Sequence, residues 1–225
     1  MQDNDKVNDL LREQIIHLQD LQNGIIAVFT DIIMSRGAGA NGHIERTISS
    51  LRLLTENMIS RGIYTHELKK IDIDIFCSAA RLYDIGKLMI PISILNKPGK
   101  LTNEEFEIMK THAMEGEHLI DQIASKLKTN MEFINHAQKF AGYHHERWDG
   151  LGYPRRLDRL NIPIQGRMMA VIDVFDALAS KRHYKEPFTP EEAEKIILDS
   201  AGEMFDPLIT DVFVEEREQF FKLYR

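Results

Sequence analysis

Histidine and aspartate residues recur in this sequence where their side chains could hold a metal ion. The densest group is the run HHERWDGLGYP at residues 144–154, which begins with two adjacent histidines. Gly150, Gly152 and Pro154 break regular structure, so the run predicts a helix end followed by a rigid loop. Imidazole nitrogens and carboxylate oxygens without a thiolate suit Fe, Mn, Zn or a similar divalent ion, often as a bridged pair. The candidate ligands are His43, Asp84, His112, His144, His145 and Asp173.

Each candidate also has a structural interpretation that involves no metal. A single histidine near a helix end more often caps the helix or lies in solvent than binds an ion. Asp173 differs because it lies in the apolar run MMAVIDVFDAL, where burying an unpaired carboxylate would be costly. A metal ion would remove that cost, so Asp173 favours the metal interpretation of the whole set.

The segments that must position these side chains are predicted to be helices, and the fold class is all-α. Apolar residues at helical spacing predict helices over about 8–34, 42–60, 65–83, 103–127, 130–145 and 164–181, and a last helix begins near Pro207. Thr102 with Glu105 predicts a capping box, and Thr189 before a proline predicts another helix start. Gly62 is expected to end the second helix, and residues 90–102 are expected to form a loop.

The first helix carries a heptad pattern that supports two interpretations. Its second half is expected to pack on its own domain, whereas its first half resembles a coiled-coil connector or a dimer stem. We therefore divide the chain into a connector helix at 1–34 and a helical domain at 35–225. The heptad positions are Leu11, Ile15, Leu18, Gln22, Ile25, Phe29 and Ile32.

Composition excludes several classes of function. The chain has 225 residues, 43% of them hydrophobic, and a net charge of -7, which argues against binding to duplex nucleic acid. Its one cysteine, Cys77, permits no internal disulfide and is expected to be a buried, inert thiol. There is no signal-peptide core and no apolar run of about 18 residues, so we expect a cytoplasmic protein without membrane association.

Four segments together resemble the HD-GYP domain, a subgroup of the HD-domain metal phosphohydrolases. The segments are YDIGK (83–87), IPISILNKPGKLTNEEFEIMKTHAMEG (90–116), HHERWDGLGYP (144–154) and AVIDVFDALASKRHYK (170–185). The resemblance spans about 43–207 and implies a helical bundle that binds two or three metals. It also implies hydrolysis of the bacterial second messenger cyclic-di-GMP to the linear dinucleotide or GMP. Members often follow a receiver or sensory domain, as in response regulators, which would agree with a connector helix.

The resemblance also implies roles for individual residues. His43, in a His-x-x-Arg pattern, would be the first metal ligand, and Asp84 would bridge two metals. Asp173 would bind the metal that His43 holds, while His112, His144 and His145 would complete the sphere of the other. Near the substrate, the resemblance places Lys87 at the scissile phosphate, Tyr153 in the loop beside the site, and Arg182 and Lys185 on the phosphates.

Two positions depart from the family pattern. The His-Asp dyad reads Tyr83-Asp84 here, and a phenol is a poor ligand for most divalent ions because its pKa lies near 10. Gly39 stands where members with three metals tend to carry a glutamate, so a third metal is not expected. We therefore expect one firmly bound ion, Fe or Mn, and a second that is weakly bound.

The sequence leaves two functions open. The first is a cyclic-di-GMP phosphodiesterase whose activity is weak or depends on metal supply, because Tyr83 replaces a ligand. The second is an inactive module that signals by binding a nucleotide or a partner protein. Two local alternatives also remain: Trp148 could simply pack its loop onto the helices, and the basic run at 181–185 could be a solvated helix end.

Overall fold

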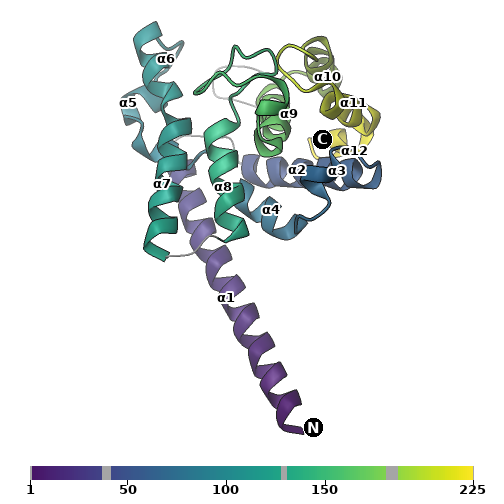
Figure 1. The fold of residues 1–225 in the computed structure, drawn as a ribbon. Coiled ribbons are helices and arrows are strands. Elements are labelled where there is room, and N and C mark those ends of the chain that lie inside the picture. The colour runs from purple at the N-terminus through teal and green to yellow at the C-terminus, as the bar shows by residue number, and fades with distance from the viewer. Residues whose placement is uncertain (1, 37–41, 128–130, 181–186, 225) are drawn as a thin grey trace.

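The structure, a computed structural model, describes residues 2–36, 42–127, 131–180 and 187–224. Within these ranges it contains helices and no β-strand, apart from one isolated bridge between Ala201 and Phe205. The prediction of an all-α fold is confirmed (Figure 1). The helices are α1 (Gln2–Ser35), α2 (His43–Ser60), α3 (Thr65–Leu68), α4 (Ile73–Ala80), η1 (Ile85–Met89), α5 (Ile92–Leu95), α6 (Asn103–Lys110), α7 (His112–Leu127), α8 (Glu132–Tyr143), η2 (Arg159–Asn161), α9 (Ile164–Ala179), α10 (Pro190–Asp199), α11 (Pro207–Glu215) and α12 (Arg217–Lys222).

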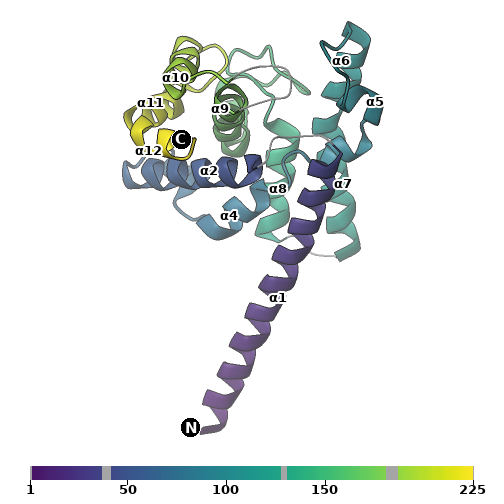
Figure 2. The same ribbon diagram turned by 180° about the vertical axis from the view of Figure 1, so that it is seen from behind.

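The N-terminal end of the long helix α1 lies far from the body of the protein, and its C-terminal end meets the body (Figures 1 and 2). Near its C-terminal end, Ile26, Thr30 and Ile33 are buried against the body. Its earlier turns expose large apolar side chains on the free part of the helix, among them Leu11 and Leu18. The expectation that the second half packs on its own domain is met, while the role of the first half as a connector or dimer stem stays a prediction.

Two predicted helices were wrong, because local side chains divide each of them into two shorter helices. The helix expected over 65–83 is interrupted after α3, since Asp72 caps a new helix by accepting hydrogen bonds from the amides of Asp74 and Ile75. The helix expected over 103–127 divides at Thr111, whose hydroxyl donates to the carbonyl of Ile108. The loop expected over 90–102 contains the short helix α5.

The local signals for helix ends are confirmed. Thr102 and Thr189 each form a complete capping box, with Glu105 and Glu192 respectively. Gly62 follows α2 with φ +69, and two backbone hydrogen bonds, from Gly62 to Ile59 and from Ile63 to Met58, close the turn. These ends depend on residues within one turn of each other, so the sequence alone could predict them.

The body is a bundle in which α2, α4, α7, α8 and α9 surround the functional residues. Its core is mostly apolar but also contains buried polar and charged side chains, among them an ion-pair group centred on Arg167 of α9, whose side chain is 1% exposed. Arg167 bonds to Asp206 at 2.9 Å and to Glu67 at 2.6 Å, and thereby joins α9 to α3 and to the start of α11. None of the described helices is long and apolar enough to cross a membrane.

Candidate metal centre

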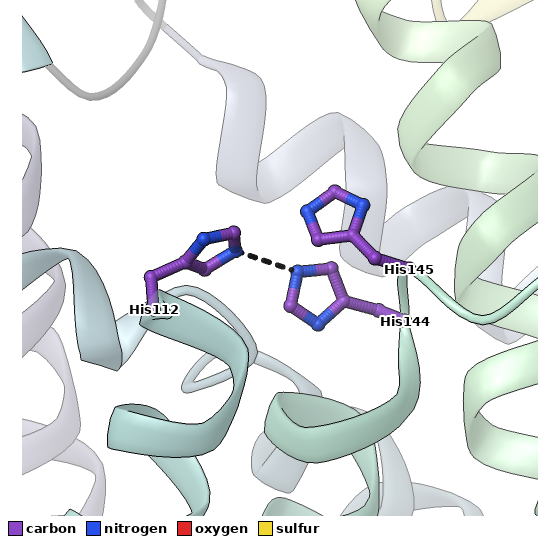
Figure 3. A group of neighbouring side chains, drawn as sticks. All are labelled: His112, His144 and His145. Carbon is purple, nitrogen blue, oxygen red and sulfur yellow. Dashed lines mark hydrogen bonds between the residues drawn. The ribbon is translucent and has the colours of Figure 1, made fainter. Parts of the chain in front are cut away.

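Three histidines meet where the ends of two helices come together (Figure 3). His112 is the first residue of α7, His144 is the C-cap of α8, and His145 follows it. One ring nitrogen of each lies within 4.8 Å of the others. Asp84 completes the arrangement, because its Oδ1 lies 3.6 Å from His112 Nε2 and 3.8 Å from His144 Nε2. We call these four residues the Asp84–histidine group.

Backbone carbonyls orient two of the rings. His112 Nδ1 donates to the carbonyl of Met109 at 2.7 Å, and His144 Nδ1 donates to that of Phe140 at 2.9 Å. In the neutral tautomers that these bonds select, both Nε2 atoms carry lone pairs, although they lie only 3.2 Å apart. Asp84 Oδ1 is buried and has no hydrogen-bond donor among the described residues. A cation between these atoms would satisfy three acceptors at once.

The protonation states of the Asp84–histidine group suit a cation. Burial lowers the pKa of His112 to about 4 and also lowers those of His144 and His145, so the three imidazoles are neutral at pH 7. Burial would raise the pKa of Asp84, but Lys87 and the nearby imidazoles outweigh it, so the pKa is lowered and the group is a carboxylate. Lys87 Nζ bonds to Asp84 Oδ2 at 2.5 Å and leaves Oδ1 available.

A glycine contact brings Asp84 against α7. Gly86, in η1, lies so close to α7 that a Cβ there would be 1.9 Å from the carbonyl oxygen of His112 and 2.5 Å from the amide nitrogen of Gly116. Only a residue without a side chain fits between the two elements. The approach places the carboxylate of Asp84, two residues before Gly86, beside the imidazole of His112.

The remaining predicted ligands lie together but are bonded through a tyrosine. Tyr83 is 1% exposed, and its hydroxyl oxygen lies 2.6 Å from His43 Nε2 and 3.0 Å from Asp173 Oδ1. We call His43, Tyr83 and Asp173 the tyrosine-bridged group. Burial, followed by the charge of Asp173, raises the pKa of Tyr83 well above its usual value, which keeps the phenol protonated.

Asp176 is a buried residue in contact with the tyrosine-bridged group that the sequence analysis missed. Its Oδ2 accepts from His43 Nδ1 at 2.5 Å, and its Oδ1 accepts from Arg46 Nε at 3.0 Å. Asp176 is 1% exposed, whereas Asp173, which the sequence singled out as costly to bury, is only half-buried. The signal was present in MMAVIDVFDAL, because a second aspartate three residues after Asp173 lies on the same side of the helix.

The loop after α8 forms one wall of the site. The Tyr153 ring stacks on His145 with centroids 4.7 Å apart, and Lys110 lies over the Tyr153 ring at 5.8 Å. Glu146 holds the loop by accepting from the amides of Arg155 and Leu157. Tyr153 therefore lies beside the histidines, as predicted.

The structure thus brings most of the predicted site residues into two adjoining groups, linked by consecutive residues Tyr83 and Asp84. Lys87 and Tyr153 border the Asp84–histidine group. The predicted phosphate-binding residues Arg182 and Lys185, and the glycine at position 39, lie outside the described residues.

Comparison with known proteins shows the family. The sequence profile of the family described as HD domain matches residues 28–209, most of the chain. The chain belongs to the HD-domain family. This membership, together with relatives named as cyclic di-GMP phosphodiesterases, confirms the resemblance to HD-GYP domains drawn from the sequence. It also supports the use of divalent metal by this HD domain.

Two curated relatives and one solved structure illustrate the similarity. A probable cyclic di-GMP phosphodiesterase of Vibrio cholerae is 36% identical over 220 residues, covering 96% of this chain and 50% of the relative. A 3'3'-cGAMP-specific phosphodiesterase of the same organism is 32% identical, covering 93% of this chain and 37% of the relative. The crystal structure of a Vibrio cholerae cyclic GMP-AMP specific phosphodiesterase has a TM-score of 0.59 at 18% identity, covering 91% of this chain and 51% of that one, and shares the fold. The chain therefore spans about half or less of the length of each of these proteins.

Proposed function

We propose that this chain is a metal-dependent phosphodiesterase that hydrolyses cyclic-di-GMP or a related cyclic dinucleotide in bacterial signalling. The observation that carries the proposal is the buried Oδ1 of Asp84, which has no hydrogen-bond partner among the described residues and faces the Nε2 atoms of His112 and His144. Buried polar atoms without a partner are rare in folded proteins, and a metal ion would supply one. The names of the similar proteins support the substrate class.

The Asp84–histidine group would hold the ion. Its three imidazoles and one carboxylate suit Fe or Mn, and the iron or manganese would offset charge on the phosphoryl oxygens and activate a water molecule. Lys87 keeps Asp84 ionised, and its side chain is partly exposed, which supports its proposed role as a cation that would contact a substrate phosphate. Tyr153 would line the same site, and Arg182 and Lys185 remain the predicted phosphate contacts.

The rate is proposed to be weak or dependent on metal supply. In the two-metal chemistry implied by the family, His43 and Asp173 would share a second ion with Asp84. Here both are hydrogen-bonded to Tyr83, which competes with that ion. The same observation favours the second candidate, a module that binds a nucleotide or partner protein without cleaving the nucleotide.

Two features of the surroundings are also proposed. A receiver or sensory domain would precede α1, and α1 would connect it to the HD domain. A homodimer would form through the heptad positions of α1, which the exposure of Leu11, Ile15 and Leu18 supports. The upstream domain and the homodimer would each transmit a signal through α1 rather than through the metal site.

Turnover of cyclic-di-GMP tests the proposal and separates the two candidates. Anaerobically purified protein would be incubated with Mn(II) or Fe(II) and either cyclic-di-GMP or 3'3'-cGAMP, and products separated by chromatography. We expect slow hydrolysis of at least one of the two dinucleotides, and we expect the His144→Ala variant to show none. The matched control His118→Ala removes an exposed histidine of α7 outside both groups and should leave the rate unchanged. A metal-loaded wild type that cleaves neither dinucleotide would contradict the enzyme and favour the binding module.

A further inference from the structure

We infer that the Tyr83 hydroxyl takes the place of a second metal ion, so that this HD domain holds one ion and not two. The hydroxyl lies between His43 Nε2 and Asp173 Oδ1, which belong to two residues that the family resemblance assigned to the second ion. Tyrosine at this position therefore does more than remove a ligand, because its own oxygen joins two of the ligands that remain. The inference rests on the proposed metal centre at the Asp84–histidine group.

Both ring nitrogens of His43 already face other side chains. Its Nδ1 bonds to Asp176, which Arg46 fixes in turn, so this nitrogen is engaged away from Asp84. Its Nε2 faces the Tyr83 oxygen at 2.6 Å. A divalent ion binds an imidazole nitrogen at about 2 Å along the same direction, and an ion and the hydroxyl cannot both lie there.

Packing prevents Tyr83 from moving aside. The side chain is 1% exposed, and its ring meets that of His144 edge-on, with centroids 5.2 Å apart and planes at 90°. Rotation of the phenol away from His43 would require space in an interior with few voids. Such rotation would also leave Asp173 without its bond to the hydroxyl. The hydroxyl is therefore held in position by the same histidine that borders the first ion.

The consequence is an asymmetric centre. The Asp84–histidine group has an acceptor without a partner among the described residues and accommodates an ion, whereas in the tyrosine-bridged group the hydroxyl donates to Asp173 and occupies the position next to His43 Nε2. The second, weakly bound ion expected from the sequence is replaced by hydrogen bonds that join α2 to α9. Restoring a histidine at position 83 should remove those bonds and open the second position.

Metal stoichiometry tests the inference without relying on activity. Wild type, Tyr83→His, Tyr83→His with His43→Ala, and His144→Ala would be dialysed anaerobically to equilibrium against Mn(II), and bound metal counted by elemental analysis. We expect one ion in wild type, two in Tyr83→His, one when His43→Ala is added, and none in His144→Ala. Tyr143→Phe, which alters a tyrosine outside both groups, serves as the matched control and should keep one ion.

The outcomes separate this inference from the proposed function. Two ions in wild type would overturn the inference while leaving the proposed centre intact. This result does not depend on whether any variant folds. A folded Tyr83→His protein that gains no ion would also overturn it. No ion in wild type would contradict the proposed centre, and a gain of one ion in Tyr83→His that needs His43 would still support the role of Tyr83. A second measurement uses protein loaded with ferric iron. A visible tyrosinate-to-iron absorption band that is lost in Tyr83→Phe would show that Tyr83 is a ligand and would refute the inference.

Discussion

Replacing Gly86 with alanine tests whether close backbone contact positions the metal centre. The new methyl carbon would lie 1.9 Å from the carbonyl oxygen of His112, whereas ordinary contact begins near 3.4 Å. One of the two backbones must therefore move by about 1.5 Å. Overpacking typically costs about 1–3 kcal/mol, and we expect the upper end because the obstacle is backbone that cannot rotate away. The free energy of unfolding should fall by about 3 kcal/mol, and Tm by about 6–12 °C.

The same movement should weaken metal binding. Asp84 precedes Gly86 by two residues and its partner His112 supplies the clashing carbonyl, so separation of η1 from α7 draws these ligands apart. We expect Mn(II) affinity to fall by about tenfold or more, as measured by calorimetric titration. Thermal unfolding in chelator measures the stability separately.

Gly24→Ala is the matched control for Gly86→Ala. Gly24 lies within α1 with nothing within 4 Å of the added carbon, so alanine there should raise Tm slightly, since alanine favours helix by about 1 kcal/mol over glycine. If Gly86→Ala matched wild type in both Tm and Mn(II) affinity, the contact between η1 and α7 would not be what positions the site.

Two further predictions concern the buried charges. Arg167→Ala should lower the free energy of unfolding, measured by urea denaturation, by about 3–5 kcal/mol, because it leaves Asp206 and Glu67 without their cation. The control Arg12→Ala, at an exposed position, should change the free energy of unfolding by less than about 0.5 kcal/mol. A small loss in Arg167→Ala would show that the pair is dispensable. Metal-free protein should lose stability as pH falls from 7.5 to 5, because the unfolded chain takes up a proton near pH 6.5 while the pKa of folded His112 is about 4. The His112 share is about 2 kcal/mol at pH 5, and a loss equally steep in His112→Ala would contradict this assignment.

Sequence reasoning predicted the parts of the fold that depend on neighbouring residues. The capping box at Thr102, the helix start at Thr189 and the turn at Gly62 each involve residues within one helical turn, and all three are confirmed. The break before α4 also has a local cause at Asp72, but apolar spacing continued across it and masked the cap. Where local signals compete in this way, tertiary packing determines which structure forms, and the spacing of apolar residues carries no information about that packing.

The candidate site was predicted as a set of residues but not as a set of bonds. The family resemblance implied that His112 and Asp84 are partners, yet the orientation of the imidazole depends on the Met109 carbonyl, which no side-chain pattern reveals. Tyr83 was recognised as a departure that removes a ligand. That its hydroxyl bonds to both His43 and Asp173 depends on three helical segments meeting, and only coordinates provide that.

Anomalous diffraction from crystals grown with Mn(II) would test the central claim most directly. The account predicts one manganese peak, bound by Asp84 Oδ1 and by nitrogens of His112, His144 and His145, with the Tyr83 hydroxyl still bonded to His43. A peak between His43 and Asp173, or no peak at the Asp84–histidine group at saturating Mn(II), would contradict it.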